Sequence, residues 1–240
     1  MTAWSNVGTA EACNQAEATL QNLVQRAKDD MQKNAEELVS TDDDLLLINT
    51  HPTTLLFNSV IQCWAASKSI NAGEKSEALL KQMKRLAGSS STSTSSSRTD
   101  EHTQDGGDDE DISSTSSSSS SSSSTTRYFD THPDIITYNT IISAWSHCGK
   151  KDAAPRAEKI VKDLIAEEQE KKMIRNNGNT KSAPVIMVNT ITFNTVLHAW
   201  SQSPLPGRTN RAEQLLEYML IQSTNPDNEF DINPDAYSFK

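Results

Sequence analysis

The sequence predicts an all-α solenoid of helical hairpins, because one motif recurs along most of its 240 residues. The motif is clearest at Pro133–Trp145, and variants of it occur at Pro52–Trp64 and Asn189–Trp200. Its last two residues also stand at Ala3-Trp4, and its beginning returns at Pro234–Phe239. Each unit of a stacked array must present the same faces to its neighbours, so stacking explains the recurrence better than a single active site does.

A constant spacing within each unit is the second observation. Twelve residues after each tryptophan stands a small residue, followed at once by Glu, and large apolar residues follow at +16 and +19. The four sets are Trp4, Ala16, Glu17, Leu20 and Leu23; Trp64, Ser76, Glu77, Leu80 and Met83; Trp145, Ala157, Glu158, Val161 and Leu164; and Trp200, Ala212, Glu213, Leu216 and Met219. The Trp-to-Trp distances are 60, 81 and 55 residues. Each unit is therefore a hairpin of constant length, whereas the connections between units vary.

Residues 1–40 form a partial repeat, mainly a second helix over Glu11–Val39. Ala, Gln, Glu, Lys and Leu dominate this segment, and all are good helix formers. The run Ser40–Asp44 ends it. We interpret its three aspartates as a solvated turn rather than a metal site, because consecutive loop side chains diverge.

Complete repeats span residues 50–87, 131–178 and 188–223, and residues 233–240 start a further one. Pro52 ends the preceding linker, and Thr53 or Thr54 can cap the helix that follows. Each first helix carries an apolar stripe at i, i+3, i+4 and i+7, which predicts one buried side. The stripes are Phe57, Val60, Ile61 and Trp64; Tyr138, Ile141, Ile142 and Trp145; and Phe193, Val196, Leu197 and Trp200. The tryptophans are thus predicted to be core residues rather than platforms for base stacking.

Residues 88–127 predict a disordered insertion rich in Ser and Asp. Such a composition buries too little apolar area to offset the entropy of ordering the chain. The segment contains seven acidic and two basic residues and so contributes −5 to the net charge of −10. The remainder is still acidic, which argues against a strongly electrostatic nucleic-acid binder.

Cys13, Cys63 and Cys148 are far apart in sequence, and their spacing indicates neither a disulfide framework nor a zinc site. A reducing compartment fits this cysteine usage. No apolar run is long enough to span a membrane. No targeting segment is visible, and both ends cut through the repeat unit, which predicts a piece of a longer protein. No catalytic arrangement stands out, so we expect neither enzymatic activity nor a cofactor or metal in this chain.

The repeat resembles the pentatricopeptide repeat family. The resemblance is carried by Pro133–Ile142, by the shorter matches Thr192–Thr195 and Leu56–Ser59, and by the Ala-Glu-x-x-Leu-x-x-Met pattern of the second helices. It implies a right-handed solenoid of helix-turn-helix repeats in which first helices line the concave face and second helices form the convex wall. The units here are longer than the roughly 35 residues usual for the family, with enlarged loops and links.

The resemblance implies binding of single-stranded RNA, about one base per repeat, read by two or three side chains. The first reading position, directly after the aromatic residue of the first helix, corresponds to Asn58, Asn139 and Asn194. The second position corresponds to Asp134, Asn189 and Asp235, their respective partners. The side chains that flank the base correspond to Leu55, Ile136 and Ile191. In the family, Asn with Asp resembles a uracil reader and Asn with Asn a cytosine reader, so the implied element is 5′-UCU-3′.

The chemistry of Asn supports this interpretation, because its amide offers both a donor and an acceptor to a pyrimidine edge. One turn further on, Gln62, Ser143 and His198 continue a polar row. The alternative is that these asparagines only bond to nearby backbone, as Asn often does. The four Glu residues after the small residue are expected to face solvent or to balance a neighbouring helix end.

We therefore expect a sequence-selective RNA-binding adaptor that acts in RNA processing, stability or translation in a mitochondrion or plastid, as the resemblance implies, with protein partners and no membrane association. Two rivals stay open. One is a protein-interaction scaffold of tetratricopeptide type, which the acidic balance and the modest number of repeats support. The other is the RNA-binding half of a protein-only nuclease that processes transfer RNA.

Overall fold

The computed structural model describes residues 9–36, 52–89, 129–176, 186, 188–225 and 230–239. Over these ranges the chain forms seven α-helices and no strand, which confirms the all-α prediction. The helices are α1 (Ala10–Glu36), α2 (Thr54–Ser67), α3 (Ala72–Ser89), α4 (Ile135–His147), α5 (Ala153–Asn176), α6 (Thr190–Gln202) and α7 (Arg208–Thr224). The expectations for Trp4, for Ser40–Asp44 and for residues 90–127 lie outside the described residues. Helix α3 continues two residues into the segment that composition assigns to the insertion.

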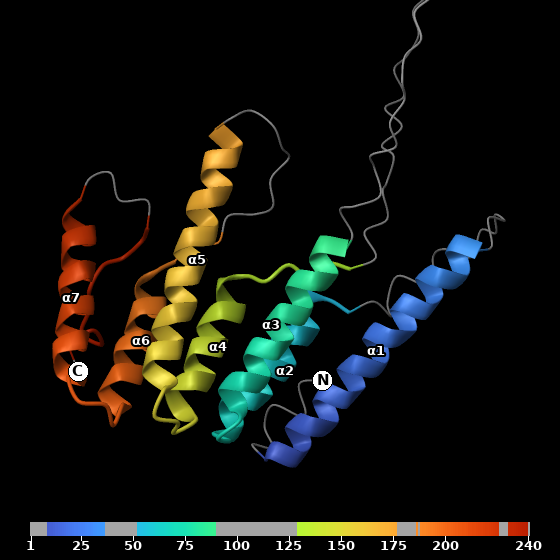
Figure 1. Ribbon diagram of the computed structural model, residues 1–240, viewed down its shortest axis with the longest axis horizontal. Helices are drawn as coiled ribbons and strands as arrows, with labels where there is room; N and C mark the ends of the chain where they lie inside the picture. The colour runs from blue at the N-terminus through green and yellow to red at the C-terminus, as the bar shows by residue number, and fades with distance from the viewer. Residues whose placement is uncertain are drawn as a thin grey trace, which may run out of the picture.

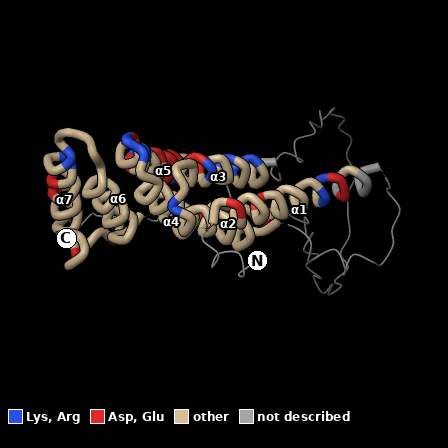
Figure 2. Tube along the Cα trace, turned by 90° about the horizontal axis from the view of Figure 1, so that it is seen from below, with Lys and Arg blue, Asp and Glu red and all other residues tan. Residues whose placement is uncertain are grey.

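Figure 1 shows the seven described helices side by side in chain order, from α1 at one end to α7 at the other. Helices α2, α4 and α6 form the central row, because α4 packs against both α2 and α6. Each of them also packs against the helix that follows it in the chain, and α1 packs against α2. Figure 2 shows α3 and α5 in a second layer, on one side of α2 and α4. None of the helices that the structure describes has the length and apolar character needed to cross a membrane.

The predicted stripes of α2, α4 and α6 form the core between the layers. All twelve stripe residues are at most 8% exposed, including the three tryptophans Trp64, Trp145 and Trp200. The prediction that these tryptophans are core residues is thus confirmed. A buried tryptophan marks the end of each hairpin's first helix and sets where the second helix packs.

At two junctions, hydrogen bonds to backbone carbonyls link the start of one unit to the start of the next. The amide of Thr54 donates to the carbonyl of Asp130 (2.8 Å), and its hydroxyl donates to the carbonyl of His132 (2.8 Å). Thr190 makes the equivalent bonds to Asp231 (3.0 Å) and Asn233 (3.0 Å). Thr53 is the N-cap residue of α2, as predicted, but its side chain makes no cap hydrogen bond, and the Thr54 hydroxyl is used in this junction.

A ladder of ion pairs joins successive second helices. Its acceptors are three of the Glu residues that follow the small residue, and its donors stand eleven residues after each tryptophan. The pairs are Glu17–Lys75 (3.2 Å), Glu77–Arg156 (3.0 Å) and Glu158–Arg211. Of the two roles expected for these Glu residues, facing solvent is wrong for three of the four, because each of the three pairs with a cation near the start of the next second helix. Glu213 is exposed, as expected.

Two of the three cations of this ladder also lie over the tryptophans of their own units. The Lys75 ammonium is 5.5 Å from the Trp64 ring centroid, and the Arg156 guanidinium is 5.6 Å from that of Trp145. Such cation–π contacts contribute about 0.5–1 kcal/mol at partly exposed sites. One basic side chain therefore links its own hairpin to the preceding one.

Glu158 is the most buried carboxylate of the ladder, at 6% exposed. It accepts from Nε1 of Trp200 (3.0 Å) and pairs with Lys162 (2.6 Å) as well as with Arg211. Burial alone raises the pKa of this carboxyl, but the hydrogen bonds from Arg211 and Lys162 outweigh it and lower the pKa to about 2. The charge of Glu158 is therefore a stabilising part of the contact between α5, α6 and α7.

Gly73, in the first turn of α3, lies against the face of Trp145. A Cβ atom added there would be 2.3 Å from Cδ2 of the indole. No real Cβ contact is that short, so a side chain at this position must displace a fully buried ring. The close approach of α3 to α4 depends on the absence of a Cβ at residue 73.

We expect Gly73→Ala to lower the free energy of unfolding by about 1–3 kcal/mol, the usual cost of overpacking a core. Gly88→Ala on the same helix is the matched control, since nothing lies within 4 Å of its added Cβ. The control should be unchanged or up to about 1 kcal/mol more stable, because Ala favours helix over Gly. Urea unfolding measures both, and equal effects at the two positions would contradict the packing of Trp145 on Gly73.

The low pKa of Glu158 predicts a defined pH dependence of stability. Because the folded pKa of about 2 lies below the usual 4.5, its contribution is complete above pH 4.5 and is lost as the pH falls toward 2. Glu158→Gln should be roughly 2–3 kcal/mol less stable than wild type at pH 7, with the gap closing near pH 2. Glu213→Gln, the equivalent change at an exposed carboxylate, should leave the profile of unfolding free energy against pH unchanged. A gap that persists at pH 2 would refute the assigned role.

Candidate nucleic-acid interface

The three predicted reading asparagines occupy equivalent positions on neighbouring helices. Asn58 lies on α2, Asn139 on α4 and Asn194 on α6, each directly after a buried aromatic residue. All three are half-buried. Because α2, α4 and α6 pack side by side, the asparagines recur once per unit along the central row.

Large aliphatic side chains lie one turn before each asparagine and are exposed. Leu55 is 76% exposed, Ile136 61% and Ile191 63%. A single exposed aliphatic residue needs no explanation, but the same position is exposed in all three units. The recurrence provides apolar surface beside each amide, which is the chemistry that the flat face of a base requires.

Asn58 is hydrogen-bonded to the next unit rather than to its own helix. Its Nδ2 donates to Oδ1 of Asp134 (3.2 Å), and its Oδ1 accepts from the hydroxyl of Thr137 (2.7 Å). The structure therefore brings together the predicted pair Asn58–Asp134, although 76 residues separate the two. We call this arrangement of Asn, Asp and hydroxyl the junction triad.

A second junction triad has the same connectivity at the other end of the row. Nδ2 of Asn194 donates to Oδ1 of Asp235 (3.0 Å), and the hydroxyl of Ser238 donates to Oδ1 of Asn194 (2.7 Å). Desolvation opposes the charge of Asp235, but the bonds from Asn194 and from the backbone of Ser238 and Tyr237 outweigh it and lower the pKa of this carboxyl. The predicted pair Asn194–Asp235 is thus also in direct contact, with Asp235 ionised at neutral pH.

The middle pair differs from the other two. Oδ1 of Asn139 is buried and has no hydrogen-bond partner. Oδ1 of Asn189 accepts instead from the amide (3.1 Å) and the hydroxyl (3.1 Å) of Thr192. A buried acceptor without a partner costs free energy, so Asn139 is the one reading amide whose hydrogen bonding is incomplete.

Asp134 and Asn189 have a structural role that the sequence analysis missed. Each is the N-cap of a first helix and forms a capping box with the Thr three residues later, Thr137 in α4 and Thr192 in α6. The signal was present as Asp-x-x-Thr and Asn-x-x-Thr, close to the known box pattern. The second reading position therefore begins one helix while facing the reading amide of the unit before it.

The polar row continues along the first helices as predicted. Gln62 and His198 are exposed, and Ser143 is half-exposed. The ring of His198 lies 5.4 Å from that of His147 at the end of α4. Burial, with a smaller effect of His147, lowers the pKa of His198, so the His198 ring is neutral at pH 7.

Charge is segregated between the two kinds of helix. Helices α2, α4 and α6 contain no Asp, Glu, Lys or Arg, whereas α1, α3, α5 and α7 carry both signs. Figure 2 shows this as tan tubes for α2, α4 and α6. The surface around the asparagines can therefore offer hydrogen bonds and apolar contact, but no formal charge from its own helices.

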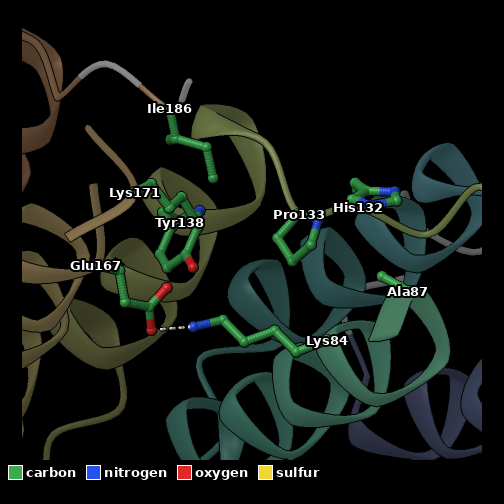
Figure 3. A pocket seen from close by; sticks show the side chains of 8 residues that line it. All are labelled: Lys84, Ala87, His132, Pro133, Tyr138, Glu167, Lys171 and Ile186. Atoms are coloured by element: carbon green, nitrogen blue, oxygen red, sulfur yellow. Dashed lines mark hydrogen bonds and ion pairs between the residues drawn. The ribbon is translucent and has the colours of Figure 1, made fainter. Parts of the chain in front are cut away.

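A small pocket of about 210 Å³ lies away from the asparagine row, where α3, α4 and α5 meet (Figure 3). Nζ of Lys84 is 2.5 Å from Oε1 of Glu167 and 5.6 Å from the centroid of the Tyr138 ring. Burial opposes the charge of Lys84, and the bond from Glu167 outweighs it, so its pKa is raised. The cation is neutralised within the protein and serves to hold α3 against α5.

Among the described residues no group of three His, Cys, Asp or Glu side chains could hold a metal ion.

The cysteines are not all far apart in space. Cys13 of α1 and Cys63 of α2 are buried, and their thiols interact across the helix contact. Burial, reinforced by Cys63, raises the pKa of the Cys13 thiol to about 12. The Cys13 thiol therefore stays protonated at neutral pH, and both buried side chains pack as small apolar groups.

Comparison with models of known protein families, with curated proteins and with solved structures finds no match in any of the three. The assignment of roles to the asparagine row therefore depends on the residues and their geometry.

The capping role of Asp134 predicts which substitutions leave the fold intact. Asp134→Ala should lower the free energy of unfolding by about 1–2 kcal/mol, because α4 loses its N-cap. Asp134→Asn should change it by less than about 0.5 kcal/mol, because Asn caps equally well, as Asn189 does in α6. Urea unfolding distinguishes the two variants. A loss as large for Asn as for Ala would show that the carboxylate charge, rather than the cap, is what stabilises this junction.

Proposed function

We propose that this chain is a right-handed solenoid of pentatricopeptide-like repeats that binds single-stranded RNA. In this proposal the first helices α2, α4 and α6 line the binding surface, and α1, α3, α5 and α7 form the outer wall. The observation that carries it is the recurrence of an Asn amide at equivalent positions of three neighbouring helices, each beside an exposed aliphatic side chain. A purely structural Asn would not need the exposed aliphatic neighbour.

The chemistry of these positions suits pyrimidines. Asn58 and Asn194 each keep one N–H donor and one carbonyl lone pair after their contacts to the next unit. A donor beside an acceptor matches the Watson–Crick edge of a pyrimidine, while Leu55, Ile136 and Ile191 cover the faces of the bases. With Asp134 and Asp235 as partners of Asn58 and Asn194, and Asn189 as the partner of Asn139, the proposed element is 5′-UCU-3′.

The rival function is a peptide-binding scaffold of tetratricopeptide type. The observation that favours it is the lack of Lys and Arg on α2, α4 and α6, since cations contacting phosphates supply much of the affinity of nucleic-acid binders. A peptide groove does not require an Asn at the same position of every first helix, however. We therefore rank RNA above a peptide as the ligand.

The proposed role is that of an adaptor without catalytic activity of its own. It would act in organellar RNA processing, stability or translation, with any processing chemistry supplied by a protein partner or by a further domain such as a nuclease. Recognition of bases by amides and apolar side chains suits such an adaptor, because it selects an RNA segment without acting on it.

RNA selection from a random single-stranded pool tests the proposal. Wild type should enrich pyrimidine-rich RNA containing UCU, and Asn139→Thr should change the preference at the middle nucleotide, because Thr cannot offer a paired donor and acceptor. Asn210→Thr, the same replacement at an exposed site on α7, should leave the selected motif unchanged. Absence of pyrimidine enrichment, or an unchanged motif in Asn139→Thr, would overturn the proposal and favour the peptide scaffold.

A further inference from the structure

Two hydroxyl groups, each belonging to the unit that follows, touch the reading amides. Oγ1 of Thr137 is 2.7 Å from Oδ1 of Asn58, and Oγ of Ser238 is 2.7 Å from Oδ1 of Asn194. Thr137 is fully buried and Ser238 is 8% exposed, so water does not compete for these bonds. The same contact thus occurs independently at two junctions.

The hydrogen atoms at the first triad can be assigned from the donors and acceptors alone. The Asp134 carboxylate can only accept, so Asn58 must turn its Nδ2 toward it (3.2 Å). The amide of Asp134 donates to Oγ1 of Thr137 (3.1 Å), which leaves the hydroxyl proton of Thr137 free to be donated elsewhere.

That proton has two oxygens within reach. Oδ1 of Asp134, at 2.8 Å, already accepts from the amide of Thr137 and from Asn58, whereas Oδ1 of Asn58 has the hydroxyl as its donor. Donation to Asn58 therefore satisfies every group in the triad. The carboxylate and the hydroxyl together select one of the two orientations of the Asn58 amide, which differ by the exchange of Nδ2 and Oδ1.

We propose that Thr137 and Ser238 are specificity-determining positioning residues, which hold the amides of Asn58 and Asn194 in one orientation toward the base. This inference rests on the proposed RNA-binding function. Each held amide presents its remaining N–H on the side of the carboxylate and its remaining carbonyl lone pair on the side of the hydroxyl. The reading residue of one unit is thus oriented by two side chains of the next.

A fixed orientation of the amide matters because uracil and cytosine present their hydrogen-bond donor and acceptor in opposite order. Uracil has a donor at N3 beside an acceptor at O4, and cytosine has an acceptor at N3 beside a donor at N4. An amide that cannot flip matches one of these patterns, whereas an amide that flips freely can serve both. Thr137 and Ser238 therefore act on the choice between the two pyrimidines more than on total affinity.

The middle unit offers an internal comparison. Thr192 occupies the position of Thr137 and forms the equivalent capping box, but its hydroxyl lies 3.1 Å from Asn189 and makes no bond to Asn139. Removal of either hydroxyl weakens the start of a first helix in the same way. Removal of the Thr137 hydroxyl releases Asn58, which is assigned to the first nucleotide, whereas removal of the Thr192 hydroxyl acts on Asn189 at the middle nucleotide. Thr192→Val is therefore the matched control for the preference at the first nucleotide.

The experiment measures dissociation constants of the full chain for 5′-UCU-3′, 5′-CCU-3′ and 5′-UUU-3′, each flanked by oligoadenosine. In Thr137→Val the preference for UCU over CCU should fall by about threefold to tenfold, the effect of one neutral hydrogen bond. Thr137→Ser, which keeps the hydroxyl, should restore it. In Thr192→Val the UCU-to-CCU ratio, which reports the first nucleotide, should equal that of wild type, and in Thr137→Val the UCU-to-UUU ratio, which reports the middle nucleotide, should be unchanged. Thermal unfolding of the two Val variants checks that their folds are equally affected.

The possible outcomes separate this inference from the function on which it rests. If wild type prefers UCU and Thr137→Val keeps the full preference, or Thr192→Val loses as much, the positioning role is wrong while RNA binding stands. If wild type shows no preference among pyrimidine and purine RNAs, the proposed function fails and this inference fails with it.

Discussion

Packing around the buried tryptophans of α2, α4 and α6 determines how one unit sits on the next, and the ion pairs between successive second helices reinforce it. Lys75 illustrates the constraint, since its ammonium lies over Trp64 of its own hairpin and pairs with Glu17 of the preceding helix. A single side chain therefore fixes both the closure of a hairpin and its position in the row. The alignment of Asn58, Asn139 and Asn194 depends on this constraint, because each asparagine lies six residues before the tryptophan of its unit.

Periodicity predicted the part of the fold that each helix determines by itself. The stripe ending in Trp145 marks the buried side of α4 whatever its neighbours are, and the structure confirms it. Glu158 was mispredicted because its position on the polar side of α5 says nothing about Arg211, which is 53 residues away. For the candidate site, the resemblance paired Asn58 with Asp134 and Asn194 with Asp235, and both pairs are in contact, but it did not predict the hydroxyl that completes each triad. The bond between Asn58 and Thr137 crosses a unit boundary, so no pattern within one unit reports it.

The asparagine row, which consists of Asn58, Asn139 and Asn194, lies on helices without charged side chains, and two of its amides make specific hydrogen bonds to the next unit. Its helices carry no formal charge, so long-range attraction of a polyanion has no source there, and discrimination must come from short-range contacts. The junction triads meet that need with a buried hydroxyl and a carboxylate that together hold an amide in place, which reduces the entropy lost when a ligand binds. The incomplete bonding of Asn139 makes the middle of the row the most adaptable position.

The backbone junctions at the starts of units also bear on how the chain is connected. Thr54 reaches Asp130 across 76 residues, and Thr190 reaches Asp231 across 41, yet the bonds are the same. Lengthening a flexible connection adds only about 0.6 kcal/mol of closure entropy for each doubling. The number of residues between units can therefore change at little cost in free energy. Insertions between hairpins can accumulate without altering the order in which the hairpins stack.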